Sequence, residues 1–435
     1  MKNRKFSLFN KNKDNNQNSD NRFAKFSETV SKYFSAEPEK EKVLRYEDFD
    51  AAGDTYYATV SAWYKVLQRV FLVGLAIFSV VSVTVNFKNI TYDNVFYLIK
   101  DFNTAVDTEN VQYETLSYDA AADQSFALYR GGLAVVSRSN VSAFTATGRR
   151  TLNSNSAYSK PFAVASDKYL LVYDIGDGNM AIYNSFANVY SEKLDYPISD
   201  VCFSKEGSFA VLTRSEEYES KIIIYDKNFK KQTNYHKGSF AVDIALSSDG
   251  KTLGAIYADT DNGIMCTKLV FFDVKKNEKI EEQVYSGEFP LACSFLDGGG
   301  FAIVTDGKVR VFDRALMDDE QSEDYSAYSV SAVWCDSEYV ALTYNNGITN
   351  DANKVLVFDK DGDLVYNDII RSDVSQLAVC DGYFFVKNAS GEVRTSIRDG
   401  MEDRLDSQDG KMLIYDGATA LLCTEAKAVY LNFDD

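Results

Sequence analysis

The sequence predicts an all-β protein, a β-propeller, preceded by an N-terminal transmembrane helix and a short helical or disordered tail. Three features support this fold class: a repeat of about 40 residues in strand-like sequence, one long uncharged apolar run, and an acidic body that follows a basic tail. We expect a cytoplasmic tail at 1–60, a transmembrane helix at 61–87, a connector helix at 88–109 and a propeller at 110–435. A chain of 435 residues is long enough for one large repeat domain with such additions.

The apolar run from Val70 to Phe87 contains 18 residues and no charge. At about 1.5 Å per residue, a helix of this length nearly crosses a hydrocarbon layer of about 30 Å. Trp63 and Tyr64 precede the run and are typical interfacial aromatics. The alternative is a buried core helix, but nothing upstream resembles a domain that could cover it. The span residues that we assign are Val70, Leu72, Leu75, Ile77, Phe78, Val81 and Val85.

The position and charge of this run predict how it sits in the membrane. It begins too far from the N-terminus for an ordinary cleaved signal peptide, so we expect a retained signal anchor. Residues 1–69 carry a net charge of +3 and the remainder −21, which gives −18 for the chain. The short basic segment before the run is expected to stay in the cytoplasm. Large domains that follow a span cross the membrane largely regardless of their charge. We therefore expect a single-pass plasma-membrane protein with a cytoplasmic N-terminus and an extracytoplasmic propeller.

The cytoplasmic tail contains one helical pattern. Phe23, Phe26, Val30 and Phe34 recur at spacings of three and four residues, which predicts an apolar helix face. Such a face could lie on the inner leaflet or bind a partner.

The repeat consists of paired apolar runs. The first runs begin at residues 133, 170, 209, 253, 301, 340, 383 and 420, so successive repeats are 37 to 48 residues apart. A second run follows each of them, and four second runs end in an aromatic residue and Asp. These pairs are Tyr225-Asp226, Phe272-Asp273, Phe312-Asp313 and Phe358-Asp359. A period near 40 residues in pure strand sequence is typical of propeller blades. We expect eight blades, with seven as the alternative.

The two ends of the repeat region predict how the ring closes. The last repeat, from Lys411, supplies three strands and then the chain stops at Asp435. The segment "VQYETLSYD", Val111 to Asp119, can supply the missing fourth strand. This closure would leave no open sheet edge.

The segment "DKDGD", from Asp359 to Asp363, has the residue types of a calcium loop but follows the aromatic-Asp position of the repeat. The equivalent segments of other repeats cannot coordinate calcium, and no Glu stands at the twelfth position of an EF-hand loop. We therefore expect a hairpin turn in which Asp359 caps the turn and Gly362 adopts a positive φ. A weak metal site at Asp359, Asp361 and Asp363 is the alternative.

On these repeats the body resembles the broad WD40-like and quinoprotein-like propeller superfamily. The complete layout, a short tail, one span and an acidic propeller, resembles an uncharacterised domain-of-unknown-function family of membrane-anchored propellers from Gram-positive anaerobes. The sequence departs from true WD40 repeats because it lacks their Gly-His and Trp-Asp dipeptides. It also lacks the Trp-bearing motif of quinone-dependent dehydrogenases, since its only tryptophans are Trp63 and Trp334. The resemblance implies no reaction.

The residue types exclude several chemistries. His236 is the single histidine, which argues against multi-histidine metal sites and most Ser-His-Asp mechanisms. No G-x-S-x-G, P-loop, H-E-x-x-H or C-x-x-C motif occurs. We expect no cofactor, and the acidic body disfavours nucleic acid.

The six cysteines are expected to be small, buried and reduced side chains. Four of them fall in or at the end of innermost-strand runs: Cys202, Cys293, Cys335 and Cys380. Free thiols in an exported protein fit an organism that lives without oxygen, and they also fit a cytoplasmic body.

The leading functional hypothesis is a non-enzymatic platform at the cell envelope that binds a protein or a cell-wall polymer. A hydrolase or lyase is the second hypothesis, which requires Asp200, Asp243 and Asp297 to converge at the channel mouth. A sensor that links propeller binding to the tail is the third. The sequence does not predict the oligomeric state. The candidate residues for a binding rim are acidic: Glu216, Glu217, Asp318, Asp319 and Glu320.

Overall fold

The computed structural model describes residues 49–85, 115–313, 319–345, 352–371, 373–406 and 409–433. The chain divides into two compact units, Met1–Ile90 and Thr91–Asp435. The helix predicted around Phe23 to Phe34 and the connector helix predicted at 88–109 lie outside the described residues.

The first unit contains helix α2 (Phe49–Val85), which overlaps the predicted span. Its segment Ala62–Val81 is long and apolar enough to cross a membrane, and none of it is buried inside the protein. The interfacial aromatics Trp63 and Tyr64 are exposed at the start of this segment. The predicted span residues from Val70 to Val81 also lie in it with exposed side chains, and Val85 is the last residue of α2.

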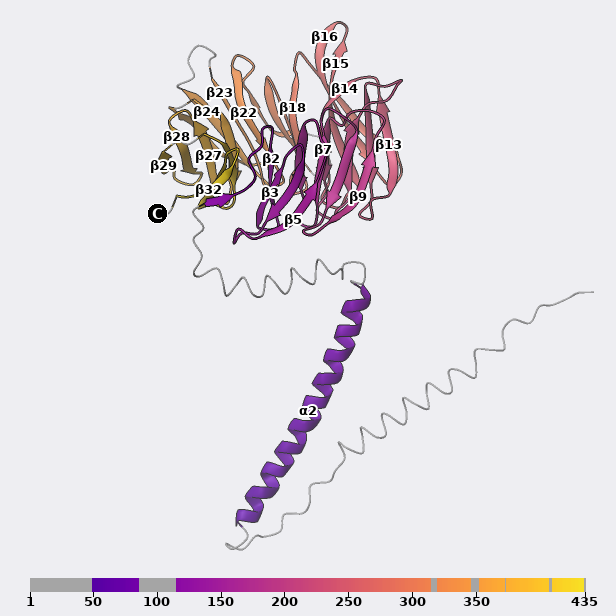
Figure 1. The fold of residues 1–435 in the computed structure, drawn as a ribbon, viewed down its shortest axis with the longest axis vertical. Helices are drawn as coiled ribbons and strands as arrows, with labels where there is room; N and C mark the ends of the chain where they lie inside the picture. Colours follow the sequence, from indigo (N-terminus) through magenta and orange to yellow (C-terminus); the bar gives the residue numbers. More distant parts are fainter. Residues whose placement is uncertain are drawn as a thin grey trace, which may run out of the picture. The chain divides into compact units, whose positions relative to one another are not determined.

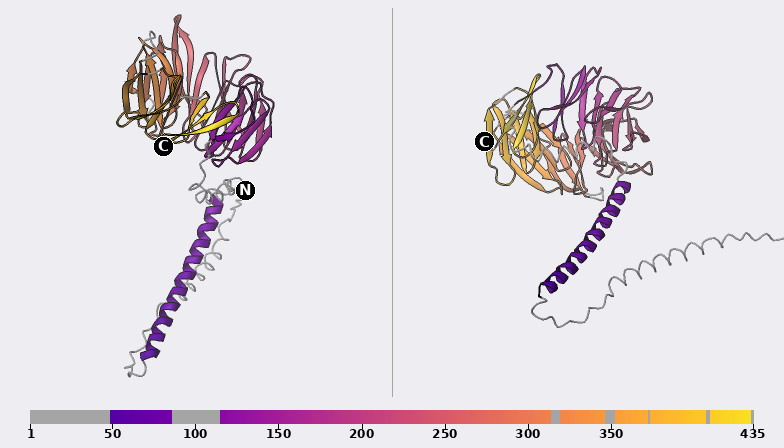
Figure 2. Two further views of the ribbon diagram at one scale, coloured as in Figure 1. Left: turned by 60° about the vertical axis from the view of Figure 1, so that its left-hand side comes forward. Right: turned by 60° about the horizontal axis from the view of Figure 1, so that its bottom comes forward.

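The second unit consists of four-stranded antiparallel sheets around a common axis (Figures 1 and 2). In seven of the sheets the strands follow one another in chain order from the innermost to the outermost, and in the eighth β1 is the outermost strand after β30, β31 and β32. Blade 1 contains β2 (Ser125–Tyr129), β3 (Gly132–Val136), β4 (Asn140–Phe144) and β5 (Arg150–Asn155). Blade 2 contains β6 (Pro161–Ala165), β7 (Leu170–Asp174), β8 (Asn179–Tyr183) and β9 (Asn188–Lys193). Blade 3 contains β10 (Asp200–Phe203), β11 (Phe209–Thr213), β12 (Ser220–Tyr225) and β13 (Lys231–Lys237). Blade 4 contains β14 (Phe240–Leu246), β15 (Thr252–Asp261), β16 (Ile264–Asp273) and β17 (Glu278–Ser286).

The remaining blades repeat this order. Blade 5 contains β18 (Pro290–Phe295), β19 (Phe301–Thr305), β20 (Lys308–Phe312) and β21 (Asp319–Asp324). Blade 6 contains β22 (Ser329–Cys335), β23 (Tyr339–Asn345), β24 (Asn353–Asp359) and β25 (Leu364–Ile370). Blade 7 contains β26 (Gln376–Cys380), β27 (Tyr383–Asn388), β28 (Gly391–Ser396) and β29 (Glu402–Asp406). Blade 8 contains β30 (Lys411–Ile414), β31 (Thr419–Cys423), β32 (Lys427–Asn432) and β1 (Thr115–Ser117).

Blade 8 closes the ring with both ends of the propeller sequence. β1 pairs antiparallel with β32, with Leu116 opposite Ala428. The Tyr118 hydroxyl donates a 2.7 Å hydrogen bond to the Thr424 carbonyl beside this pairing. Eight blades and a circular clasp are therefore confirmed, with three residues of the predicted segment forming the strand.

The aromatic-Asp pairs of the sequence mark a recurrent bulge. In blades 1 to 6 the pairing of the third strand with the fourth shifts register at an aromatic residue: Phe144, Tyr183, Tyr225, Phe272, Phe312 and Phe358. A bulge bends and twists the strand locally, so the third strand ends in a sharp turn. In blade 6 the Asp359 Oδ1 accepts 3.0 Å hydrogen bonds from the Asp361 and Asp363 amides, and Gly362 has φ of 89°. The predicted hairpin turn at Asp359 is confirmed.

The hydrophobic core lies between blades. Eight buried clusters each join residues of two neighbouring blades, one cluster for each junction around the ring. At the junction of blades 4 and 5, for example, Ile256 and Phe271 pack with Phe301 and Ile303. Because each blade contributes to two such clusters, the ring is stabilised as a whole and its loops can vary without loss of the core.

Candidate functional site: the central channel and the hairpin face

The central channel contains a cavity of about 680 Å³. Innermost strands β6, β10, β14, β18 and β22 supply most of its wall. The chemistry-bearing side chains that line it are Asp200, Asp243, Cys202, Cys293, Cys335, Lys205 and Asp336.

Asp200 and Asp243 are hydrogen-bonded to each other across neighbouring blades. Asp243 Oδ1 accepts a 2.8 Å hydrogen bond from the Ile244 amide, and its Oδ2 accepts a 2.8 Å bond from the Cys293 amide of the next blade. Asp200 likewise accepts from the Val201 amide of its own strand and the Ile244 amide of the next blade. The two carboxyl groups therefore make equivalent bonds to successive innermost strands.

This arrangement has a structural cause. An innermost strand has one edge without a ladder partner, and a buried backbone N–H must find an acceptor elsewhere. In β14 the pairing also shifts register between Ala241 and Asp243, which turns this part of the strand away from a regular ladder. Side chains of the preceding blade supply acceptors at other junctions too, as Gln376 Oε1 does for the Met412 amide at 2.8 Å.

The environment raises the pKa of both carboxyl groups. Burial raises the pKa of Asp243 to about 8, with a further contribution from the neighbouring Asp200 charge, and burial also raises the pKa of Asp200. Two carboxyl groups in hydrogen-bond contact cannot both ionise without strong repulsion. The pair therefore keeps a proton at neutral pH.

We predict that this pair makes the propeller less stable as pH rises. The folded state keeps a proton that the unfolded chain loses near pH 4, so the free energy of unfolding falls as pH rises from about 4 toward 8. Asp243→Asn removes one titrating group while keeping an acceptor for the Cys293 amide. We expect the variant to lose less stability than the unchanged protein between about pH 5 and pH 8, measured by urea unfolding.

The control for this prediction is Asp167→Asn, because Asp167 is exposed in the turn between β6 and β7. It should follow the pH dependence of the unchanged protein. Parallel stability curves for Asp243→Asn and the unchanged protein would contradict a shared proton at this pair.

Of the three carboxyl groups that the hydrolase hypothesis requires, Asp200 and Asp243 line the cavity side by side. Asp297 lies in the turn between β18 and β19, where its Oδ2 forms a 2.5 Å ion pair with Lys205. The directly bonded pair Asp200–Asp243 is also closer than the separation of about 5–9.5 Å used by glycoside hydrolases. Asp297 is not among the residues that line the cavity, but its partner Lys205 is, so the convergence of Asp297 with the pair stays a prediction.

The channel thiols are poor nucleophiles. Burial raises the pKa of Cys202, Cys293 and Cys335 well above its usual value, and the thiolate is the reactive form. All six cysteines are free, and the four predicted for innermost strands lie in β10, β18, β22 and β26. Across the described parts of the chain, no three His, Cys, Asp or Glu side chains are grouped so that they could hold a metal ion, those around Asp359 included.

A second candidate surface lies on one face of the ring. Antiparallel order places the loops between second and third strands on the same face as the loops that join one blade to the next. We call this the hairpin face, because the β15–β16 hairpin extends from it (Figure 1). β15 and β16 have ten residues each, against five to seven for the second and third strands of the other blades.

Six exposed apolar side chains lie at this face between blade 3 and the start of blade 6, in its loops or at the strand ends beside them. Phe240 and Ile264 are each 57% exposed; elsewhere in the propeller Ile369 and Met401 are similarly exposed, at 59% and 66%. We call the six residues the apolar patch: Tyr218, Phe240, Ile264, Met265, Phe289 and Tyr328.

Hydrogen bonds tie the loops of the apolar patch to one another. The Ser220 hydroxyl donates to the Ser239 carbonyl at 2.8 Å and accepts from the Ala241 amide at 2.7 Å, which fixes Phe240 beside the Tyr218 loop. The Gly287 amide donates to the Met265 carbonyl at 2.7 Å, two residues before Phe289.

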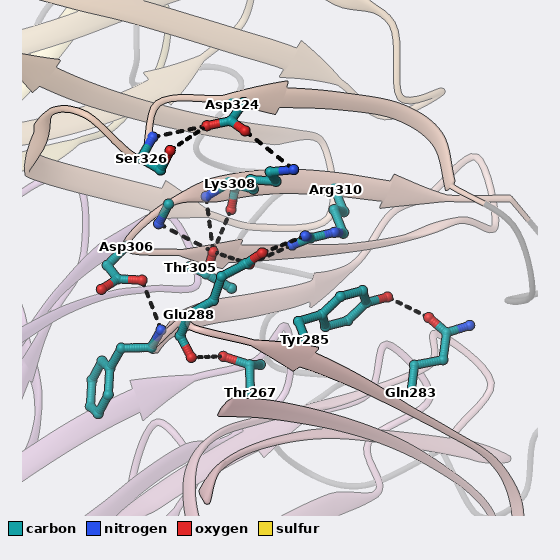
Figure 3. A network of polar contacts seen from close by, with 12 residues as sticks. Thr267, Gln283, Tyr285, Glu288, Thr305, Asp306, Lys308, Arg310, Asp324 and Ser326 are labelled. Carbon is teal, nitrogen blue, oxygen red and sulfur yellow. Dashed lines mark hydrogen bonds and ion pairs between the residues drawn. The ribbon is translucent and has the colours of Figure 1, made fainter. Parts of the chain in front are cut away.

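The junction of blades 4 and 5 supports the centre of this face (Figure 3). The Phe289 amide donates a 2.7 Å hydrogen bond to Asp306 Oδ1. Beside it, Arg310 forms two hydrogen bonds of 2.6 and 2.7 Å to the Glu288 carboxylate, which also accepts a 2.7 Å bond from Thr305. The loop that carries Phe289 is therefore rigidly held, and a rigid surface loses little conformational entropy when it binds.

The opposite face is made of short polar turns. Asp226 Oδ1 accepts hydrogen bonds of 2.8 and 2.9 Å from the Asn228 and Lys230 amides. Asp273 Oδ1 accepts a 2.8 Å bond from the Lys276 amide. The described turns of this face satisfy their own polar groups and expose fewer large apolar side chains than the hairpin face, Met401 being one of them.

The two predicted acidic rims are not on the same face. Glu216 and Glu217 lie in the loop between β11 and β12, on the hairpin face. Asp319 and Glu320 begin β21, whose first end is on the opposite face, and Asp318 lies outside the described residues. Sequence reasoning missed the apolar patch, although the apolar pair Ile264-Met265 directly after the turn signal "DNG" could have indicated it.

The fold defines an eight-bladed β-propeller, and solved structures of this architecture are similar to it. BamB from Moraxella catarrhalis has 14% sequence identity and a TM-score of 0.50, covering 74% of this chain and 97% of BamB. The C-terminal WD40 domain of Sif2 has 12% identity and a TM-score of 0.52, covering 73% of this chain and 97% of that domain. A likeness at this identity concerns the fold alone.

The chain belongs to DUF5711, a family of unknown function, which matches residues 104–401. A search of curated proteins finds no match. The resemblance to a propeller family without an assigned function is confirmed, and function must be argued from the surfaces described above.

Proposed function

We propose that this protein is a membrane-anchored binding platform of the cell envelope, and that its hairpin face binds another protein. The apolar patch is the observation that carries the proposal. Exposed aromatic and aliphatic side chains grouped on one face are typical of protein interfaces. The described turns of the opposite face expose fewer such side chains, Met401 among them.

Anchoring by α2 supports the same role. The segment Ala62–Val81 exposes a continuous apolar surface that water would disfavour. We propose that it is a retained anchor, with the N-terminus in the cytoplasm and the propeller outside.

Protease treatment of intact protoplasts tests the orientation. A tag after Asp435 should be removed from intact protoplasts by added protease. Survival of the tag until lysis would place the propeller in the cytoplasm and direct the search to cytosolic partners. A tag before Met1 is the matched control, because it should be cleaved only after lysis.

Site-specific cross-linking in cells tests the binding face. A photo-reactive amino acid at Phe240 or Phe289 should give a cross-linked product of one common mass. The same group at Met401, which is 66% exposed in the turn between β28 and β29, should not give it. Equal products from all three positions, or none from Phe240 and Phe289, would contradict a partner on the hairpin face.

The alternative of a hydrolase or lyase would use the Asp200–Asp243 pair as its acid and base. The pair already has a structural reason to exist, since both carboxyl groups accept hydrogen bonds from innermost-strand amides. The binding platform is therefore the function that the geometry favours.

A further inference from the structure

The charges around the apolar patch indicate what kind of partner it fits. Three lysines of this face are already paired with carboxylates: Lys237 with Glu282 at 3.6 Å, Lys268 with Asp259 at 2.6 Å and Lys308 with Asp324 at 3.2 Å. These pairs occupy three cations of the face, and Arg214 and Lys221 flank the acidic residues of the β11–β12 loop.

The loops that carry the apolar patch also contain four carboxylates outside these ion pairs. Glu216, Glu217 and Glu219 flank Tyr218 and are exposed, and Asp261 lies at the tip of the β15–β16 hairpin beside Ile264. Within the described residues these four carboxylates form no ion pair. Each lies within a few residues of a patch side chain, so a partner that covers the patch would also cover or approach them.

Covering unpaired carboxylates with a partner is unfavourable unless the partner supplies cations. A second copy of this chain would bring the same carboxylates opposite one another. An anionic lipid surface or a nucleic acid would meet the same repulsion. A partner with positive charge can cover the patch and pair with these carboxylates.

We propose that the hairpin face binds a basic polypeptide segment that carries aromatic or aliphatic side chains. Its apolar side chains pack on Phe240, Ile264 and Phe289, and its Lys or Arg side chains pair with Glu216, Glu217, Glu219 and Asp261. This inference rests on the proposed function, because it names the chemistry of the partner for the same face.

Peptide selection on the full-length protein tests the inference. The protein is held in nanodiscs of phosphatidylcholine, and the probe is a displayed library of short random peptides. Four proteins are compared: the unchanged chain, a patch variant (Phe240→Ser with Ile264→Ser), a charge variant (Glu216→Gln, Glu217→Gln and Glu219→Gln) and the exposed control Met401→Ser. All replaced side chains are exposed, and urea unfolding checks that each variant keeps its fold.

We expect the selected peptides to carry net positive charge together with aromatic side chains. The peptides should bind Met401→Ser as tightly as the unchanged chain and should not bind the patch variant. They should bind the charge variant about tenfold more weakly than the unchanged chain. Raising NaCl from about 0.05 M to about 0.5 M should weaken binding to the unchanged chain and have less effect on the charge variant.

The outcomes separate the two proposals. Selected peptides that are neutral or acidic, that do not bind the patch variant and whose affinity does not change with NaCl would overturn the proposal of a basic partner. They would still support the hairpin face as a binding face. Peptides that bind the patch variant as well as the unchanged chain would overturn both proposals. Self-association abolished by the patch variant, or photo-labelling of lipid from position 240, would assign the face to a second copy or to the bilayer and would also overturn the inference.

Discussion

Arg310→Met is expected to lower the free energy of unfolding of the propeller by about 3–5 kcal/mol, because it leaves a buried carboxylate without its cation. The side chains of Arg310 and Glu288 are only 7% and 13% exposed, and they form the two-bond pair shown in Figure 3. Burial alone would raise the pKa of Glu288, but the hydrogen bonds from Arg310 and Thr305 more than offset this and the pKa lies below its usual value. Urea unfolding followed by Trp334 fluorescence measures the loss, in a Trp63→Phe background so that α2 contributes no signal.

The double variant Arg310→Met with Glu288→Met is the control. Replacement of both members of a buried pair by apolar side chains is often neutral, so the double variant should recover more than half of the loss. Equal destabilisation of the single and double variants would contradict this explanation. It would mean that packing of the guanidinium over the Tyr285 ring, 4.0 Å from its centroid, matters more than the pairing of charges.

Gly254→Val is expected to destabilise the propeller by about 3 kcal/mol through overpacking. A Cβ atom at Gly254 in β15 would lie 2.5 Å from the Phe301 ring, which is fully buried between blades 4 and 5. The higher strand propensity of valine would offset at most about 1 kcal/mol of this loss of stability. The ring cannot move away, because it contacts Phe271 and Phe295 edge to face at 4.8 and 4.7 Å between centroids. Thermal unfolding by near-ultraviolet circular dichroism provides the measurement.

Gly238→Ala is the matched control for this substitution. No atom lies within 4 Å of the Cβ that it would add, and Gly238 does not have a positive φ. Its stability should match that of the unchanged protein. A Gly254→Val variant that unfolds at the same temperature as Gly238→Ala would show that the blade 4–5 junction can shift to make room.

The fold could be predicted because the repeat is local in sequence. Each first run becomes a buried second strand, and each aromatic-Asp pair becomes a bulge followed by a turn, as at Tyr225-Asp226. The closure could also be predicted, because an incomplete last repeat and an extra strand before the first one leave a single way to avoid open edges.

The candidate sites could be predicted only in part. Asp200 and Asp243 were identified because they occupy the same position of successive innermost strands, which places them side by side. Asp297 belongs to a turn, and its attachment to Lys205 depends on how two turns meet in space rather than on a repeat position. The apolar patch was missed for a similar reason: its residues come from separate loops, and only the ring brings these loops together on one face.

The clasp of blade 8 has a mechanical consequence if α2 anchors the protein in a membrane, as proposed above. The chain that leads from α2 enters the propeller at β1, so any force between the anchor and the ring reaches the ring through Thr115–Ser117. These three residues are held by pairing with β32, by the Tyr118 hydroxyl and by burial of Leu116. Force applied through the chain that joins α2 to β1 would therefore act first on the pairing of β1 with β32. The ring would open first at this pairing, before any other blade is strained.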